Sequence, residues 1–475
     1  MAQPKGLFVL SGTEMGERFS FYVLHSILAL FMVDVLHFDL AFASLVFGLV
    51  LASTSILQIF GGYITDKCVG NRKAIYLGGI LMMISQFIIA FSASLYASSA
   101  NIPVHSSFIF TFQENMFIIG IIILAIGSSF FKASIFSLVG LLYDSNDSRM
   151  DSGYTIFYMA INIGGLLATL VAAIVVGEGH PELFQYGFLI SGIFLALSLL
   201  FFTYFKDKYI ISSTGTPVGV VPLVNDEKFL AQRETSNISD KLSKIEIDRI
   251  YVIVLLSIMS IIFFIGFEQE ASSMIFFIKQ SVNSLIPVVN IDLSPQSFLS
   301  INPLAIMILA PIFVELWAIL DRRNKEPSIV AKIGIGLIVL AIAYIVLGIG
   351  FAMVENSGLK APILCVITFY VLITVSELLI SPVGLSLVIK LAPPKYTSSF
   401  MGLWFVAMAI GDSLAGYFAG FYPDSTKYAV KYFLGFIPID NLISFGGLFV
   451  VTSLIFGITC LLFKNKIIKL MHGVK

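Results

Sequence analysis

Twelve apolar stretches of about 20 residues recur along this chain of 475 residues, and each is long enough to cross a bilayer as a helix. The first six are expected near residues 17–35, 43–64, 74–95, 117–142, 153–176 and 186–204. The second six are expected near residues 250–278, 298–320, 333–353, 363–388, 400–421 and 443–463. Charged residues make up only 12% of the chain, against roughly a quarter in a soluble domain, so lipid must be the solvent for much of the surface.

A polar stretch at residues 205–248 separates the two sets of spans and predicts a loop. We therefore expect an N-terminal six-helix bundle at 1–206, a cytoplasmic linker at 207–248 and a C-terminal six-helix bundle at 249–475. Two such halves predict an all-α membrane protein of the major facilitator fold. In that fold we expect the substrate at the midplane between the bundles, and alternating access by rocking of one bundle against the other.

The distribution of basic residues supports this topology. With the N-terminus inside, about 22 of the 28 Lys and Arg residues fall on inner segments, in agreement with the positive-inside rule. Only Lys279, Lys360, Lys427 and Lys431 fall on outer loops. We therefore expect a multi-pass protein of the cell inner membrane with both termini in the cytoplasm.

The loop after the second span carries the sequence GGYITDKCVGNRK, with Gly62, Asp66, Arg72 and Lys73. The glycine permits close helix approach, and the acidic and basic residues predict a charged latch on the cytoplasmic side. This pattern resembles the loop signature of major facilitator proteins. The alternative is an ordinary basic cytoplasmic turn.

The sequence contains no motif typical of an enzyme active site or of a metal site. The three cysteines, Cys68, Cys365 and Cys460, are far apart and predict neither a disulfide framework nor a zinc site. No HExxH or GxSxG motif occurs, so we expect a chain that is not an enzyme and needs no cofactor or metal. The inner basic residues are explained by topology, so no nucleic-acid partner is expected.

Ionisable residues form a stripe in the first span, GTEMGERFSFYVLH. Glu14, Arg18, Tyr22 and His25 recur at steps of three or four, and Glu17 lies beside Arg18. A polar stripe on an apolar helix predicts a cavity-facing surface rather than a lipid-facing one, because a charge in the bilayer centre costs about 2.5–3.5 kcal/mol. The alternative, chiefly for Glu14, is a helix N-terminus at the interface, where a carboxylate suits the helix dipole.

Lys132 is the single charge of a long apolar run in the fourth span. It lies about ten residues, or about 15 Å, from the inner end of the span at Tyr143. That distance is long for a lysine that snorkels to the interface, so we expect Lys132 in a cavity.

The second half carries carboxylates in its spans. Glu268 and Glu270 in GFEQEASS are two residues apart, so they need different surroundings on a helix. Glu377 lies in the middle of the tenth span, near Ser381 and Pro382, and the proline interrupts the helix there. Salt bridges between spans are the alternative reading of Glu268 and Glu377. For Asn162, Asn302 and Trp404, interhelical hydrogen bonding or packing is as good an explanation as ligand contact.

The spans of the first half contain two cations, and those of the second half contain anions that could be their counterparts. Arg18 and Lys132 are cations of the first half, and Glu268 and Glu377 are anions of the second. A zwitterion with separated ends fits such poles, with its carboxylate at the cations and its ammonium at Glu377. Burial of a carboxylate favours its neutral form, which suits proton coupling. This argument leaves the length of the substrate open.

Several ordered motifs resemble the proton-dependent oligopeptide transporter family, from Gly12 to about Gly416. Its first-span pattern ExxERFxYY is matched by Glu14, Glu17, Arg18, Phe19, Phe21 and Tyr22. Further matches are TIFYMAINIGG around Asn162, GSSFFKAS at Lys132, FEQ at Glu268, SINPL at Asn302, SELLISP at Glu377 and MGLWF at Trp404.

The resemblance implies inward co-transport of di- and tripeptides with protons by a chain that functions as a monomer. It implies proton coupling by Glu14, Glu17, Arg18, Lys132 and Glu268. It implies a substrate site made of Arg18, Tyr22, His25, Lys132, Asn162, Glu268, Asn302, Glu377, Ser381 and Trp404. Other readings remain open: transport of another zwitterion or an anionic metabolite, or a peptide sensor that does not transport.

The sequence departs from the family pattern at several positions. Phe21 stands where the pattern has a tyrosine, and His25 stands where an arginine is usual. A histidine can titrate near neutral pH, so coupling at this position is expected to differ. The linker lacks the two extra apolar helices that many bacterial members carry.

Overall fold

The computed structural model describes residues 3–96, 111–143, 149–177, 180–212, 215–222, 243–286, 291–393, 397–423 and 430–473. Within these ranges, twelve helices are long and apolar enough to span a membrane, so the prediction of an all-α chain with twelve spans is confirmed. The part of the chain that precedes residue 223 contains α1 (Lys5–Asp34), α2 (Leu40–Ile64), the π-helix η1 (Thr65–Val69), α3 (Asn71–Ser94), α4 (Phe112–Gly140), α5 (Met150–Val175), the short helix η2 (Pro181–Leu183) and α6 (Phe184–Tyr209).

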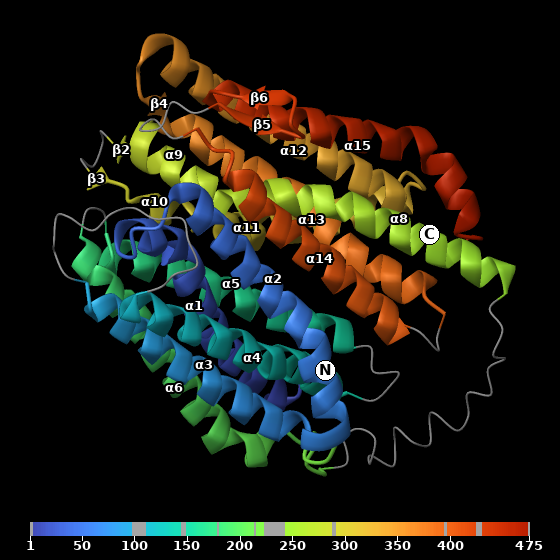
Figure 1. The fold of residues 1–475 in the computed structure, drawn as a ribbon. Helices are drawn as coiled ribbons and strands as arrows, with labels where there is room; N and C mark the ends of the chain where they lie inside the picture. The colour runs from blue at the N-terminus through green and yellow to red at the C-terminus, as the bar shows by residue number, and fades with distance from the viewer. Residues whose placement is uncertain are drawn as a thin grey trace. The chain divides into compact units, whose positions relative to one another are not determined.

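The part that follows residue 242 contains the other six spans (Figure 1). Its helices are α8 (Lys244–Phe267), η4 (Glu268–Ala271), α9 (Ser273–Ser281), α10 (Pro295–Phe298), α11 (Ile301–Arg322), α12 (Ile329–Ser357), α13 (Ile363–Leu391), α14 (Thr397–Ala419) and α15 (Leu442–Leu470). Three pairs of short strands join its loops: β1 (Val282–Asn283) with β4 (Ala361–Pro362), β2 (Leu285–Ile286) with β3 (Ile291–Asp292), and β5 (Lys431–Phe433) with β6 (Ile437–Ile439).

Contacts divide the chain into two compact units. Unit 1 consists of Met1–Phe38 and Ser53–Asn237, and unit 2 consists of Asp39–Ala52 and Ile238–Lys475. The helix α2 contributes to both, because its residues up to Ala52 group with unit 2 and its later residues with unit 1. Each unit therefore has its own core, and each is described by itself.

In unit 1, α1 packs against α5 and α6, and α3 packs against α4 and α6. Small residues make these approaches close, as they do in membrane helices generally. A Cβ on Gly164 of α5 would lie 2.5 Å from the backbone oxygen of Met15 in α1. Ser20 of α1 and Ser191 of α6 share a hydrogen bond of 2.8 Å between their hydroxyls. These contacts hold α1 so that most of its surface is enclosed by protein.

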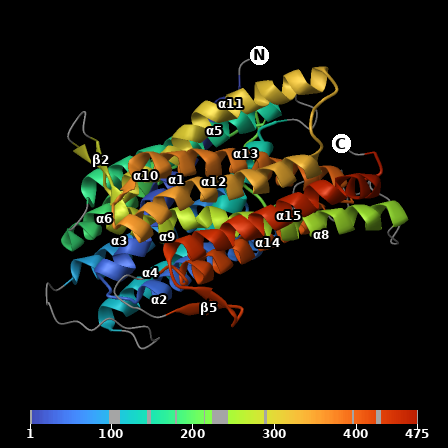
Figure 2. The ribbon, with the colours of Figure 1, turned by 90° about the horizontal axis from the view of Figure 1, so that it is seen from above.

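In unit 2, α12 packs against α13 and α15, α13 packs against α11, and α8 packs against α14. Figure 2 shows α12, α13 and α15 running side by side along their length. The Ser376 hydroxyl of α13 donates to the Gly336 carbonyl of α12 at 2.7 Å, and interhelical bonds of this kind are worth about 0.6–2 kcal/mol in lipid. The ring of Trp404 in α14 packs directly on Gly384 of α13, where no Cβ would fit.

The seventh span differs from the continuous helix that hydropathy alone predicts. It consists of α8, the 3-10 turn η4 and α9, with Ser272 at the join. Side chains satisfy the carbonyls that the break frees: Tyr344 donates to the Gly266 oxygen at 2.7 Å and Tyr370 to the Glu270 oxygen at 2.8 Å. Because buried backbone groups in a membrane need partners, these two tyrosines explain why the span can be interrupted here.

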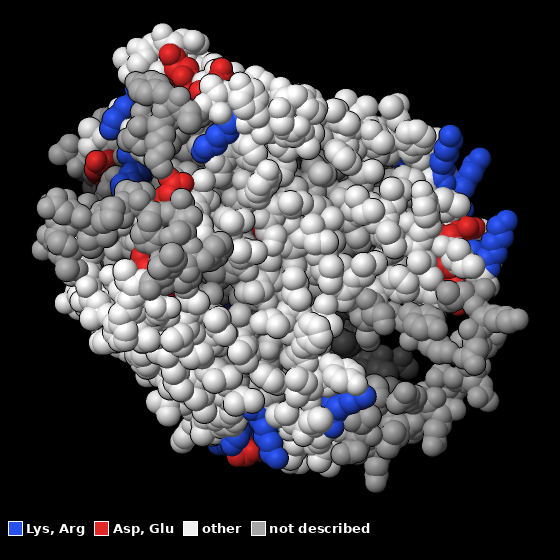
Figure 3. Space-filling model, in the orientation of Figure 1, with Lys and Arg blue, Asp and Glu red and all other residues white. Residues whose placement is uncertain are grey.

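The visible acidic and basic side chains gather toward the ends of the helices (Figure 3). Most of the other side chains visible on this face are uncharged. The exposed apolar side chains of the described residues include Ile174, Leu200 and Val314. Exposed apolar side chains on long apolar helices are what contact with the hydrocarbon layer of a membrane requires.

Candidate functional site

The first cluster of charges lies inside α1 and not at its end. The helix begins at Lys5, nine positions before Glu14, so the interpretation of Glu14 as a helix-terminal carboxylate is wrong. Glu14, Glu17 and Arg18 are 1%, 0% and 7% exposed. Enclosure by α5 and α6 explains this burial, because α1 packs against both helices.

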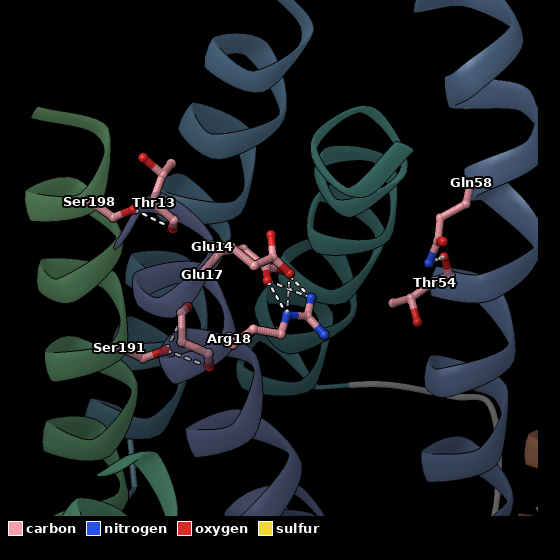
Figure 4. Close-up of polar contacts among 9 residues, drawn as sticks. Thr13, Glu14, Glu17, Arg18, Thr54, Gln58, Ser191 and Ser198 are labelled. Carbon is pink, nitrogen blue, oxygen red and sulfur yellow. Dashed lines mark hydrogen bonds and ion pairs between the residues drawn. The ribbon is translucent and has the colours of Figure 1, made fainter. Parts of the chain in front are cut away.

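Arg18 binds both carboxylates of this cluster (Figure 4). Its Nε donates to Glu17 Oε2 at 2.5 Å and its Nη2 donates to Glu17 Oε1 at 2.6 Å, which is a two-pronged contact. Arg18 Nε also lies 3.1 Å from Glu14 Oε1. Bidentate pairs of this kind combine strength with fixed geometry. One guanidinium thus serves two buried carboxylates, which leaves the group with one more acidic than basic residue.

The ring of Phe21 connects Arg18 to Lys132. The Arg18 Cζ lies 4.8 Å from the Phe21 ring centroid, and the Lys132 Nζ lies 4.6 Å from the same centroid. Both distances are typical of cation–π interactions, which gain strength where water is excluded. The structure thus brings Arg18 of α1 and Lys132 of α4 to one aromatic ring.

Two further residues of the stripe lie beside Phe21. His25 stacks on it with ring centroids 6.0 Å apart, and Tyr22 meets His25 edge to face at 6.1 Å. His25 is buried, whereas Tyr22 is partly exposed. Along α1, these charged and aromatic side chains therefore form a continuous series of contacts, which is largely buried.

Asn162 of α5 has a more local environment. Its Nδ2 donates to the Tyr158 carbonyl one turn earlier in the same helix, at 2.9 Å. The glycines that follow it pack on the α1 stripe: a Cβ on Gly164 would lie 3.2 Å from Arg18 Cβ, and one on Gly165 would lie 3.2 Å from the Tyr22 ring. The segment around Asn162 thus contributes close helix packing next to the charged stripe.

In unit 2, the amide of Asn302 in α11 binds Glu377 of α13. Asn302 Nδ2 donates to Glu377 Oε2 at 2.9 Å and to Thr374 Oγ1 at 3.1 Å. The Thr374 hydroxyl donates in turn to the Tyr370 carbonyl at 2.8 Å. The chain of bonds fixes the carboxylate of Glu377, which is partly exposed, as is the nearby Ser381.

Glu268 begins the 3-10 turn η4 and is partly exposed. Its charge acts on that of Glu377, so the turn brings two carboxylates of different helices close together. Trp404, by contrast, is fully buried against Gly384, which makes it part of the core of unit 2.

The predicted latch has a different composition in the structure. Asp66 and Lys73 are exposed, and Gly62 of α2 faces Ala133 of α4. Arg72 is buried and donates to the last turn of α6 and to the segment that follows it. Its partners are the Asp207 carboxylate at 2.8 Å, the Ile210 carbonyl at 2.5 Å and the Val218 carbonyl at 2.8 Å. The loop after the second span is thus attached to the start of the linker.

Gly219 completes that attachment. Its carbonyl accepts from the Arg72 backbone N–H at 2.9 Å, and its φ of 71° is one that residues with a Cβ rarely adopt. Sequence reasoning identified Arg72 but not its partners, because the polar composition of the linker predicts a loop and says nothing about where it binds.

Comparison with known proteins identifies the family. The sequence profile of the POT family matches residues 72–221 and 220–434, which together exceed half of the chain. The chain belongs to the POT family of peptide transporters. It is 27% identical over 492 residues to uncharacterized transporter YclF of Bacillus subtilis (strain 168), with 95% of this chain and 94% of that protein covered.

Other POT relatives agree in length and fold. A di-/tripeptide transporter of Lactococcus lactis subsp. lactis (strain IL1403) is 26% identical over 524 residues, with 100% of this chain and 97% of that protein covered. A crystal structure of peptide transporter POT in complex with sulfate matches with a TM-score of 0.80 at 25% identity, covering 100% of this chain and 97% of that one. The predicted major facilitator architecture is confirmed, and the chain is a multi-pass membrane protein.

Proposed function

We propose that this POT protein is a proton-coupled symporter that imports di- and tripeptides across the cell inner membrane by alternating access. The proton gradient is its energy source, it uses no cofactor, and it works as a monomer with both termini in the cytoplasm. Membership of a family of peptide transporters supports the substrate class. The named function of the Lactococcus relative supports the same class.

The observation that carries the proposal is the arrangement of Arg18 with Glu14, Glu17 and Lys132. Two buried carboxylates share one guanidinium at 2.5–3.1 Å, and Lys132 lies on the ring that Arg18 also contacts. If a peptide carboxylate binds Arg18, the guanidinium is drawn from the two buried glutamates, which then lack the cation that contacts them both. Binding a proton relieves that cost, so peptide binding and proton binding favour each other.

The two units offer complementary charges to the two ends of a peptide. We propose that Arg18 and Lys132 of unit 1 bind its carboxylate and that Glu377 of unit 2, held by Asn302, binds its ammonium group. Glu268 takes part in proton coupling. We further propose that Tyr22, His25, Asn162, Ser381 and Trp404 shape the rest of the site, Trp404 through the packing of α14 on α13.

Uptake of radiolabelled dialanine into liposomes tests this function. An inward proton gradient is expected to drive accumulation above equilibrium, and unlabelled di- and tripeptides are expected to compete whereas free alanine is not. The Lys132→Ala variant is expected to lose accumulation, and the Lys466→Ala variant, which removes an exposed lysine of α15, is expected to retain it. If other zwitterions or anionic metabolites compete and peptides do not, the substrate is one of those compounds and the assignment to di- and tripeptides is wrong. Binding of peptide without any uptake would favour a sensor.

A further inference from the structure

Glu270 is a buried carboxyl group that the proposed mechanism does not yet use. It lies in η4, at the break of the seventh span, two residues after Glu268. The residue is 6% exposed, and its Oε2 has no hydrogen-bond partner among the residues that the structure describes. The sequence requires different surroundings for the two glutamates, and the 3-10 turn places Glu270 on the enclosed side.

The donors that surround η4 are already engaged with other acceptors. The Tyr370 hydroxyl donates to the Glu270 backbone carbonyl, and the Tyr344 hydroxyl donates to the Gly266 carbonyl. Gln269 Nε2 donates to the Ile265 carbonyl of α8 and to the Ala415 carbonyl of α14, each at 3.0 Å. A tyrosine has one donor and an amide has two, so these residues retain none for the carboxyl group.

The charged groups that act on Glu270 are acidic. They are Glu268 of the same turn and Glu377 of α13, while Tyr344 of α12 and Tyr370 of α13 are the titratable hydroxyls that face it. No lysine, arginine or histidine of the described ranges acts on it. Within those ranges, no three acidic, histidine or cysteine side chains are placed to hold a metal ion.

We propose that Glu270 is a proton-binding site of unit 2, separate from Glu268, and that it carries a proton on Oε2 at neutral pH. An ionised carboxylate buried without a cation or a donor is very costly, and a metal ion has no ligand set here. A proton is the ligand that removes the charge and needs no additional space. The proposal deepens the proton coupling proposed above and rests on it for its role in transport.

The position of Glu270 gives its proton a structural consequence. If the proton leaves, Oε1 and Oε2 both need donors, and the nearby donors bind the carbonyls that the helix break exposes. Ionisation of Glu270 therefore competes with the bonds that hold η4 in its present form. Protonation of this residue stabilises the broken conformation of the seventh span.

Infrared difference spectroscopy of purified protein at neutral pH tests the proposal without any transport step. The spectrum of the wild type minus that of Glu270→Gln is expected to show the carbonyl stretch of a protonated carboxylic acid. Glu268→Gln is the control. The wild type and this variant both keep the Glu270 acid band, so that band is expected to cancel in the spectrum of the wild type minus that of Glu268→Gln. Glu270→Asp is expected to shift the band, which keeps the assignment testable if the glutamine variant does not fold.

Two results would overturn the proposal. One is a wild-type spectrum with no acid band that depends on residue 270, and the other is a carboxylate band that disappears in Glu270→Gln. Failure of peptide uptake with the acid band present would count against the transport function and leave the proton site standing. Peptide uptake by a protein without the acid band would count against the proton site at Glu270 and leave the transport function standing.

Discussion

Arg18 is expected to be the residue whose loss costs unit 1 the most stability, because it is the counter-charge of two buried carboxylates. Replacing it with leucine leaves Glu14 and Glu17, which are 1% and 0% exposed, without the guanidinium that contacts them both, and Lys132 is then the cation that still acts on Glu14. Removing one partner of a buried ion pair costs about 3–5 kcal/mol. We expect Arg18→Leu to lower the free energy of unfolding by about that amount at neutral pH.

A second substitution separates the stability of the cluster from its function. Glu17→Gln combined with Arg18→Leu removes one of the two stranded charges, so it is expected to recover part of the stability, with a coupling energy of about 1–3 kcal/mol. Transport is not expected to recover, because the double variant has neither the guanidinium for the peptide carboxylate nor the Glu17 carboxylate for proton coupling. Recovery of stability without recovery of transport would show that the ion pair does more than stabilise the fold.

Unfolding of purified protein in graded denaturant, followed by circular dichroism, measures these energies, and liposome uptake measures transport. Arg322→Leu, which removes an exposed arginine at the end of α11, is the matched control and is expected to unfold like the wild type. If Arg18→Leu unfolds like the wild type, or if the double variant is no more stable than the single one, the reasoning about shared charge is refuted.

Three further predictions concern the linker, the helix packing and the acidic site. Arg72→Ala is expected to speed proteolysis of the segment after α6, with Lys73→Ala as an exposed control that leaves it unchanged. Gly164→Ala places a Cβ 2.5 Å from a backbone oxygen of α1 and is expected to cost about 1–3 kcal/mol of stability, whereas Gly348→Ala meets no atom within 4 Å and is expected to cost little. Asn302→Leu removes a hydrogen bond to a carboxylate and is expected to raise the KM for dialanine about tenfold in uptake assays.

Much of the charged site could be predicted from the sequence, because a charged side chain in a membrane span costs free energy unless it faces protein or water. Arg18 and Lys132 lie in apolar spans, and the cost of exposing them to lipid predicts that they face protein or water. The ring of Phe21 that links them was not predictable, since the approach of α4 to α1 depends on packing across the whole of unit 1. Sequence periodicity places residues on a face of one helix but does not select the neighbouring helix.

The break in the seventh span lies beyond what hydropathy reports. Its carbonyls are satisfied by Tyr344 and Tyr370, which are about 80 and 100 positions away in the chain and belong to α12 and α13. The same break determines that Glu270 is buried and Glu268 is not. The spacing of two residues predicts different surroundings for the two glutamates, but it does not predict which of them is buried. Local sequence sets the propensity of the helix to break. Donors from distant parts of the chain satisfy the carbonyls that the break frees, which a membrane interior requires.

The central claim, proton-coupled peptide symport, is tested most directly by following the pH inside liposomes that contain the purified protein. With an inside-negative potential and a pH-sensitive dye within, addition of dialanine is expected to acidify the interior, and Lys132→Ala liposomes are expected to show no acidification. If correctly folded wild-type protein gives no acidification with any of a panel of di- and tripeptides, the claim is contradicted.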